Sequence, residues 1–212
     1  MDLGDLPEVP RLDAADRLFV PGSPPGDWRG VACVNFGSPE IGYVEGFLRA
    51  ADLAVQHVLK TGNDQDYLVY PIVFCYRQHL ELRIKGLLLD ACCLLGESLP
   101  SKELMGKHKL MPIWRMLCPL LDRIFDNASE LMIVGDRLQE FEDLDPDSFA
   151  FRYATSKAGK SLLPKDLEQV NLENLRDTMQ KIADMLDAAD TGVKVYLDNK
   201  AEAAIYRREY ES

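Results

Sequence analysis

Apolar positions recur along most of the chain at the spacing of helices. In residues 38–62, apolar side chains return every three or four positions from Ile41 to Val58, which is the period of one helix face. Ser38 is a favourable residue before a first helical turn, and Gly62 is typical of a helix end. The sequence therefore predicts an amphipathic helix over this range.

The segment "YRQHLELRIKGLLL", residues 76–89, has charged and apolar residues at alternating positions, which is typical of a half-buried strand. However, it belongs to a run, residues 67–95, that contains no turn signal before Gly96. A strand usually has about 3–10 residues, and the Leu, Ala, Arg and Lys of this run favour helix. We therefore predict a long helix that is apolar around most of its circumference and lies centrally in the fold.

Further helical patterns follow. The stretch 106–125 predicts a third helix that Pro119 kinks or divides, because an interior proline costs about 3 kcal/mol. A fourth helix is predicted over 128–143. Asn171 is suited to cap a fifth helix, and residues 193–210 have a weaker pattern that predicts a separate last helix.

Two stretches lack a helical period. Residues 1–37 are rich in proline and predict an extended arm. We expect the arm to be ordered only where its apolar residues meet a groove, namely at Leu18, Phe19, Trp28 and the short "VACVNF" stretch, residues 31–36. In residues 145–165, aromatic side chains alternate from Phe149 to Tyr153 ahead of the turn-like "SKAGK", which predicts a small β-hairpin.

These elements predict an all-α fold of about five to six helices with a small β-hairpin insertion and an extended Pro-rich N-terminal arm. The expected organisation is an arm over residues 1–37, a helical bundle over 38–190 with its hairpin at 145–165, and a C-terminal helix over 191–212.

Composition narrows the classes of function. The chain has 24 basic and 35 acidic residues, so its net charge of −11 gives no general attraction to nucleic acid or to anionic membranes. Any contact with nucleic acid would need a local basic patch. The acidic N-terminus lacks a signal sequence and no apolar run is long enough to span a bilayer, so we expect a cytoplasmic protein that does not enter membranes. The five cysteines have no zinc-binding spacing, and we expect buried thiols in a reducing compartment with no metal and no cofactor.

Charged residues within the central helix are the first candidates for chemistry. Arg77, Glu81 and Lys85 are spaced by four positions and share one helix face, where Glu81 has a cation one turn away on either side. His79 lies on the same helix, and His108 lies near the start of the next. An imidazole removes protons near neutral pH, and an arginine holds phosphate with two parallel hydrogen bonds.

Together these residue types suit metal-independent cleavage of RNA, in which a histidine activates the 2′-hydroxyl and an arginine stabilises the negatively charged phosphorane. The candidate catalytic residues are Arg77, His79, Glu81 and His108. The candidate ligand-binding residues are Arg152, Tyr153, Lys85 and Lys157.

These candidate residues also have purely structural interpretations. Arg77 and Glu81 suit a buried ion pair that Arg152 joins, and loss of one partner would leave a buried charge. His79 suits a half-exposed surface position, and His108 suits a cap at the helix N-terminus.

Three motifs support a family resemblance. "PIVFCYRQHLELRIKGLLL", "GKHKLMPIW" and "FRYATSKAG" resemble, in this order, segments of bacterial HEPN-like proteins. The resemblance covers residues 67–160 and implies a helical bundle that usually dimerises and often belongs to toxin–antitoxin, phage-defence or RNA-processing systems. Active members of the family are metal-independent ribonucleases that use Arg-x(4–6)-His. This sequence departs from that motif, because one residue separates Arg77 from His79 and the two side chains point about 160° apart on a helix.

Two hypotheses follow. The first is a HEPN-like binding or regulatory protein of a bacterial defence or toxin–antitoxin type system. It would form a homodimer and engage a partner protein from the same operon or an RNA or nucleotide ligand. The second is a metal-independent ribonuclease with a composite Arg/His site.

Overall fold

The structure is a computed structural model that describes residues 12–19, 30–34, 37–126 and 128–210. The chain divides into two units, Met1–Pro39 and Glu40–Ser212. Ahead of Pro39, the described residues form turns and bends, and the side chains of Leu18 and Phe19 are exposed. Trp28, for which a groove contact was expected, lies outside the described residues.

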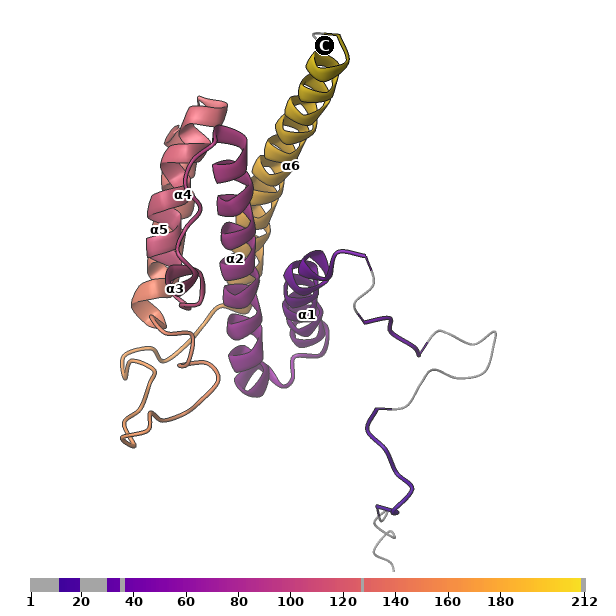
Figure 1. The fold of residues 1–212 in the computed structure, drawn as a ribbon. Helices are drawn as coiled ribbons and strands as arrows, with labels where there is room; N and C mark the ends of the chain where they lie inside the picture. Colours follow the sequence, from indigo (N-terminus) through magenta and orange to yellow (C-terminus); the bar gives the residue numbers. More distant parts are fainter. Residues whose placement is uncertain (1–11, 20–29, 35–36, 127, 211–212) are drawn as a thin grey trace, which may run out of the picture. The chain divides into compact units, whose positions relative to one another are not determined.

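The second unit is helical, and Figure 1 shows α2, α4, α5 and α6 running roughly alongside one another. The helices among the described residues are α1 (Pro39–Thr61), α2 (Gln65–Leu95), α3 (Lys102–Met105), α4 (Leu110–Phe125), α5 (Ala128–Leu144) and α6 (Leu172–Tyr210). The described part of the chain contains no β-strand. These observations confirm the all-α bundle. No helix in this part of the chain combines the length and the apolar character that crossing a bilayer would need.

Helix α2 occupies the centre of the bundle and continues through the segment of alternating charges, as predicted from its length. Its buried side chains lie around most of its circumference, so it contacts α4 on one side and α6 on another. Gly96 ends the helix with a φ of 70°, a left-handed conformation that favours glycine, and its amide donates to the carbonyl of Cys92.

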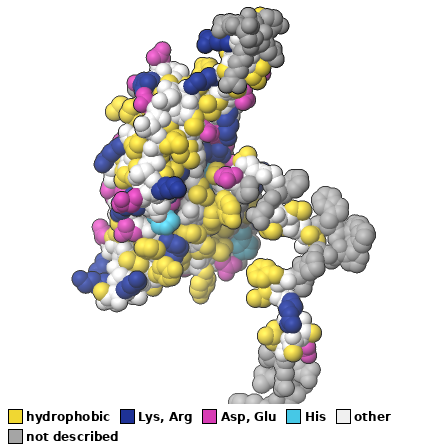
Figure 2. Space-filling model, in the orientation of Figure 1, with side chains coloured by type: hydrophobic (Ala, Val, Ile, Leu, Met, Phe, Trp, Pro, Cys, Tyr) yellow, Lys and Arg dark blue, Asp and Glu magenta, His cyan; other side chains and the backbone are white. Residues whose placement is uncertain are grey.

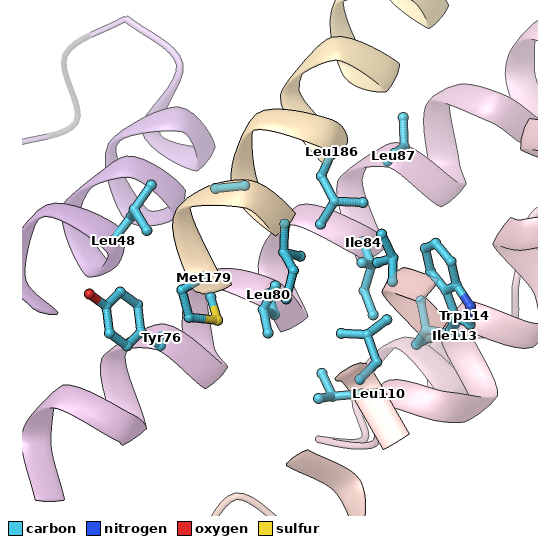
Figure 3. Packing of buried hydrophobic residues seen from close by; sticks show 14 of the residues in the cluster. Leu48, Tyr76, Leu80, Ile84, Leu87, Leu110, Ile113, Trp114, Met179 and Leu186 are labelled. Carbon is cyan, nitrogen blue, oxygen red and sulfur yellow. The ribbon is translucent and has the colours of Figure 1, made fainter. Parts of the chain in front are cut away.

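The hydrophobic core lies between α2, α4 and α6, with α1 and α5 completing it. Figure 3 shows Ile84 of α2 between Leu186 of α6 and Trp114 of α4, with Leu87 further along α2. The largest side chains with essentially no exposed surface include Tyr76, Ile72, Leu80, Ile84, Leu110, Ile113, Leu117 and Leu138. Burial of each such side chain contributes roughly 1.5–3 kcal/mol to the free energy of folding.

Two glycines allow the helices to approach closely. A Cβ atom on Gly135 of α5 would lie 2.5 Å from Nε1 of Trp114, and one on Gly192 of α6 would lie 2.7 Å from the ring of Phe125. Both distances are shorter than van der Waals contact. The aromatic rings of α4 therefore pack directly on glycine backbone in α5 and α6.

The structure differs from the sequence prediction in the helices. Residues 193–210 do not form a separate helix, because α6 continues from Leu172 to Tyr210 without a break. Likewise, Pro119 does not divide α4, which is a single helix from Leu110 to Phe125. The short helix α3 was not predicted.

The expected hairpin over residues 145–165 is not confirmed, because these residues contain no β-strand. The pairing observed there is a single isolated bridge between Thr155 and Ser161. Backbone hydrogen bonds from Ser156 to the Lys160 carbonyl and from Gly159 to the Ser156 carbonyl close a tight turn. The alternation from Phe149 onward thus belongs to an irregular loop.

The expectation of buried thiols also needs correction. Only Cys92 among the five cysteines is buried, Cys75 and Cys118 are partly exposed, and Cys33 and Cys93 are exposed.

Candidate functional site

The buried guanidinium of Arg77 ties three parts of the bundle together. Its Nε donates to the carbonyl of Asp145 at 3.1 Å, and Nη2 donates to the carbonyl of His108 at 2.6 Å. Its Nη1 donates to Oε2 of Glu81, one turn further along α2, at 3.3 Å. Arg77 has no exposed surface. The side chain therefore connects α2 to the segment before α4 and to the end of α5.

Glu81 is the counter-ion of this network and is 1% exposed. While Oε2 accepts from Arg77, Oε1 lies 2.8 Å from Nζ of Lys85 and 3.0 Å from Nδ1 of His108. Nζ of Lys85 also donates to the carbonyl of Lys107 at 2.9 Å. One buried carboxylate thus has two fixed cations and an imidazole around it, which offsets the cost of burying its charge.

Asp145 fixes the start of the loop that follows α5. Its Oδ1 accepts the backbone amides of Phe149 at 2.8 Å and Ala150 at 3.0 Å, while its carbonyl accepts from Arg77. Asp145 is 3% exposed. The loop therefore begins at a point that α2 holds by a charged hydrogen bond.

We call residues 149–165 the basic loop. It contains Arg152, Lys157, Lys160 and Lys165 but no acidic residue, within a chain whose net charge is −11. The three lysines are exposed, and none pairs with a carboxylate of the described residues. In Figure 2, Lys and Arg side chains lie at the lower left of the molecule, where Figure 1 places this loop.

Arg152 is held among aromatic rings. Its Cζ lies 4.8 Å from the ring centroid of Phe149, 5.3 Å from that of Phe74 and 5.8 Å from that of Tyr153. Its Nε donates to the carbonyl of Ser148 at 2.6 Å. Each cation–π contact contributes about 0.5–1 kcal/mol at an exposed site. The guanidinium and the exposed faces of Phe149 and Tyr153 are thus fixed next to each other.

His79 of α2 lies in a different part of the bundle, where α2 faces α1 and α6. Its Nδ1 is 3.0 Å from the carbonyl of Val44 in α1, and its buried Nε2 has no hydrogen-bond partner. Burial lowers the pKa of His79 below its ordinary value, and the charge of Arg83 acts in the same direction. Arg83 itself pairs with Glu45 of α1 at 2.7 Å and with Asp187 of α6 at 2.7 Å.

The structure brings together four of the residues that the sequence singled out: Arg77, Glu81, Lys85 and His108. The buried Arg77–Glu81 ion pair is confirmed, but Arg152 does not join it. His79 is fully buried instead of half-exposed. His108 does not cap α4, whose first amide, at Leu110, donates to the Glu142 carboxylate instead.

Sequence reasoning missed two carboxylates, Asp145 and Glu142. Asp145 precedes a proline, and Asp-Pro is a turn signal that could have identified it as a side chain bonding to nearby backbone amides. No comparable local signal exists for Glu142, because its partner is the amide of Leu110 on another helix.

The solvent exposure of Arg77 and His108 limits the chemistry that this site can perform. Arg77 has no exposed surface and its hydrogen bonds go to backbone carbonyls and Glu81, so in this conformation it does not reach a phosphate. The His108 side chain is 47% exposed. Because a carboxylate oxygen accepts, the 3.0 Å contact with Glu81 Oε1 selects, of the two neutral tautomers of His108, the one that carries its proton on Nδ1 and a lone pair on Nε2. The basic loop, in contrast, presents exposed cations together with exposed aromatic rings.

Comparisons with protein-family models, with curated proteins and with solved structures find no match to this chain.

Proposed function

We propose that this chain is a HEPN-like, non-catalytic helical bundle that binds RNA or a nucleotide on its basic loop, as a regulatory component of a bacterial defence or toxin–antitoxin system. The family part of this proposal rests on the resemblance of the three sequence motifs. The binding part rests on one observation: the basic loop carries four cations and no acid, and one of these cations, Arg152, lies against aromatic rings.

The charge of the basic loop supports an anionic ligand. Phosphate groups provide most of the binding energy in complexes with nucleic acids, through lysine and arginine. Elsewhere the chain is strongly acidic, so a polyanion would be repelled from the rest of the surface. Binding would therefore be confined to this loop.

The aromatic rings favour single-stranded RNA over a duplex. Phe149 is 43% exposed and Tyr153 is 57% exposed, so both present ring surface to solvent. Stacking of an unpaired base on an aromatic side chain contributes about 1–3 kcal/mol and tolerates any sequence. A duplex hides its base faces and would gain only the phosphate contacts.

The buried network supplies rigidity to the loop. Asp145 holds the amides of Phe149 and Ala150, and Arg77 holds the carbonyl of Asp145. A ligand that binds a loop already fixed at one end loses less conformational entropy than one that must order the loop. On this account Arg77 and Glu81 act through the loop's position and do not contact the ligand.

Fluorescence anisotropy with a labelled single-stranded RNA tests the proposal. For single strands, the logarithm of the association constant falls with the logarithm of salt concentration with a slope of about −0.7 per phosphate contacted. We expect Lys157→Gln with Lys160→Gln to make this slope shallower by about 1.4. Arg152→Ala should weaken binding several-fold. Arg137→Ala is the matched control, because Arg137 is an arginine of α5 that pairs with Glu140.

Binding that is unaffected by the loop variants, or the absence of any RNA binding at low salt, would refute this function. A partner protein from the same operon would then be the better ligand for an acidic bundle. Homodimerisation is part of the proposal and is read from the mass of the purified protein by light scattering.

A second candidate function is the metal-independent ribonuclease, which the Glu81–His108 contact favours. A carboxylate that holds Nδ1 of a histidine leaves Nε2 as a base, as in other carboxylate–histidine pairs. Time-dependent RNA cleavage in EDTA that is abolished by His108→Gln would establish this function. We expect the RNA to stay intact instead.

A further inference from the structure

A cavity of about 520 Å³ lies between the first turns of α2, the end of the loop and the start of α6. Its apolar lining includes Phe151, which is 5% exposed, Leu172, which is 7% exposed, and the half-buried Leu163 and Leu167. Figure 1 shows the orange loop beside the N-terminal end of α2. The volume falls within the range of about 300–1,000 Å³ that is typical of small-molecule sites.

The polar groups of the cavity have one sign of charge. Asp66 of α2 and Glu168, which follows the basic loop, line it and are exposed to solvent, and Gln65 and Gln169 add amide groups. Within the described part of the chain, no lysine, arginine or histidine lines this cavity. An anionic ligand would be repelled, whereas an ammonium group would have two carboxylates in the lining of the cavity.

Aromatic rings in the lining also favour a cationic ligand. Tyr70 and Phe151 both line the cavity, with ring centroids 6.5 Å apart and planes tilted by 49°. The face of an aromatic ring is negative and attracts a cation, and rings also provide apolar contact area. Carboxylates, aromatic rings and apolar side chains in the lining of one cavity suit a ligand that has both a positive charge and an apolar body.

We propose that this cavity binds a small organic ammonium ion with an apolar or aromatic body. Its ammonium group lies near Asp66 and Glu168, and its body lies against Phe151 and the loop leucines. The cavity shares Phe151 and Leu163 with the basic loop. It takes the opposite charge from the proposed RNA site, which involves Arg152 and the lysines of that loop. The side chain of Phe151 is buried and lines the cavity. The neighbouring Arg152 is exposed and does not line it, but contacts the ring of Phe149.

Three probes that share an indole body test the preference for a cation. Tryptamine carries an ammonium group, tryptophol a hydroxyl group and indole-3-acetate a carboxylate. Isothermal titration of the full chain at pH 7 should rank the affinities in this order. Two exposed carboxylates together favour a cation by roughly fivefold over the neutral probe, and indole-3-acetate should bind more weakly again.

Variants then locate the site. The double variant Asp66→Asn with Glu168→Gln should remove the preference for tryptamine over tryptophol while leaving tryptophol binding within about twofold, because the apolar floor is unchanged. Leu163→Trp should fill the cavity and weaken binding of both probes. Glu140→Gln is the matched control, because Glu140 is an exposed carboxylate outside this cavity that pairs with Arg137. Circular dichroism verifies that each variant is folded.

Equal affinity for the three probes would show an apolar cavity without charge recognition and would overturn the proposal, as would the absence of tryptamine binding at millimolar concentration. Two variants distinguish a failure of this proposal from a failure of the RNA-binding proposal. Arg152→Ala should weaken RNA binding without weakening tryptamine binding, and the Asp66/Glu168 double variant should do the reverse.

Discussion

Arg77 donates a hydrogen bond from Nε to the backbone carbonyl of Asp145, 68 positions further along the chain, and neither side chain has more than 3% exposed surface. The same guanidinium is paired with Glu81, so a charged group in the centre of α2 holds the point where the loop leaves α5. Charges in the most hydrophobic segment of the sequence thus serve to attach irregular backbone to the core.

Removal of Glu81 should destabilise the fold strongly. In Glu81→Ala, Arg77 stays buried without its counter-ion, and loss of one partner of a buried pair costs roughly 3–5 kcal/mol. Urea unfolding followed by circular dichroism measures this change in the free energy of unfolding. Glu140→Ala removes an exposed partner of Arg137 and should change it by less than about 0.5 kcal/mol. Equal stability of the two variants would place the Arg77 network outside the core.

Removal of the Asp145 side chain should loosen the start of the loop. In Asp145→Ala, the amides of Phe149 and Ala150 lose their acceptor, although the carbonyl that accepts from Arg77 is retained. Hydrogen exchange of peptides covering these two amides should become at least about tenfold faster, since about 1.4 kcal/mol corresponds to tenfold and a lost charge-assisted hydrogen bond costs that much. Exchange rates that match the wild type would show that Asp145 does not fix the loop.

His79 should make stability depend on pH below its ordinary pKa. Its folded-state pKa lies below the value of 6.5 that applies when the chain is unfolded, so the unfolded state binds more protons as the pH falls. The stability that neutral His79 contributes is therefore fully present above pH 6.5 and is lost as the pH falls toward the folded-state pKa. Protonated His79 would also be repelled by Arg83, although Glu45 and Asp187 face it with the opposite charge.

The measurement compares wild type with His79→Gln, which does not titrate. Between pH 7.5 and pH 5.5, the free energy of unfolding should fall more for wild type than for the variant. The difference between the two proteins removes other titrating groups, including Asp187, whose pKa is raised by burial and whose effect has the opposite sign. An identical fall in both proteins would contradict the buried, neutral state of His79.

Substitution of glycine by alanine should have opposite effects on stability at Gly192 and at Gly86. Gly192→Ala would place a Cβ 2.7 Å from the Phe125 ring, and overpacking of this kind costs about 1–3 kcal/mol. Gly86→Ala in α2 meets nothing within 4 Å and should stabilise the helix by about 0.5–1 kcal/mol. Thermal unfolding of the two variants should therefore shift in opposite directions, and a shared direction would disprove the close contact of α4 with α6.

Local sequence signals predicted much of the fold. Helical spacing, Asn171 as a cap and Gly96 as a stop are features of the neighbouring residues alone, and the structure contains all three. Spacing by four also predicted the pairing of Glu81 with Arg77 and Lys85, because residues one turn apart meet on any helix.

Other features depend on contacts between distant segments and could not be predicted. The position of His79 against Val44 depends on how α1 packs, and the neighbouring charges alone predict a surface position for this histidine. The loop after α5 has an alternating pattern, yet Asp145 and Arg77 impose a different backbone path through long-range hydrogen bonds. Arg152 contacts three aromatic rings, including that of Phe74 in α2, and does not join the ion pair of Arg77 with Glu81.

Hydrogen exchange of the wild-type protein with and without single-stranded RNA, at low salt, tests the central claim most directly. We predict slower exchange in peptides covering residues 149–165, little change in residues 193–210 of α6, and RNA that stays intact on a gel run from the same samples. Unchanged exchange in the basic loop, or RNA that is cleaved during the measurement, would contradict the account.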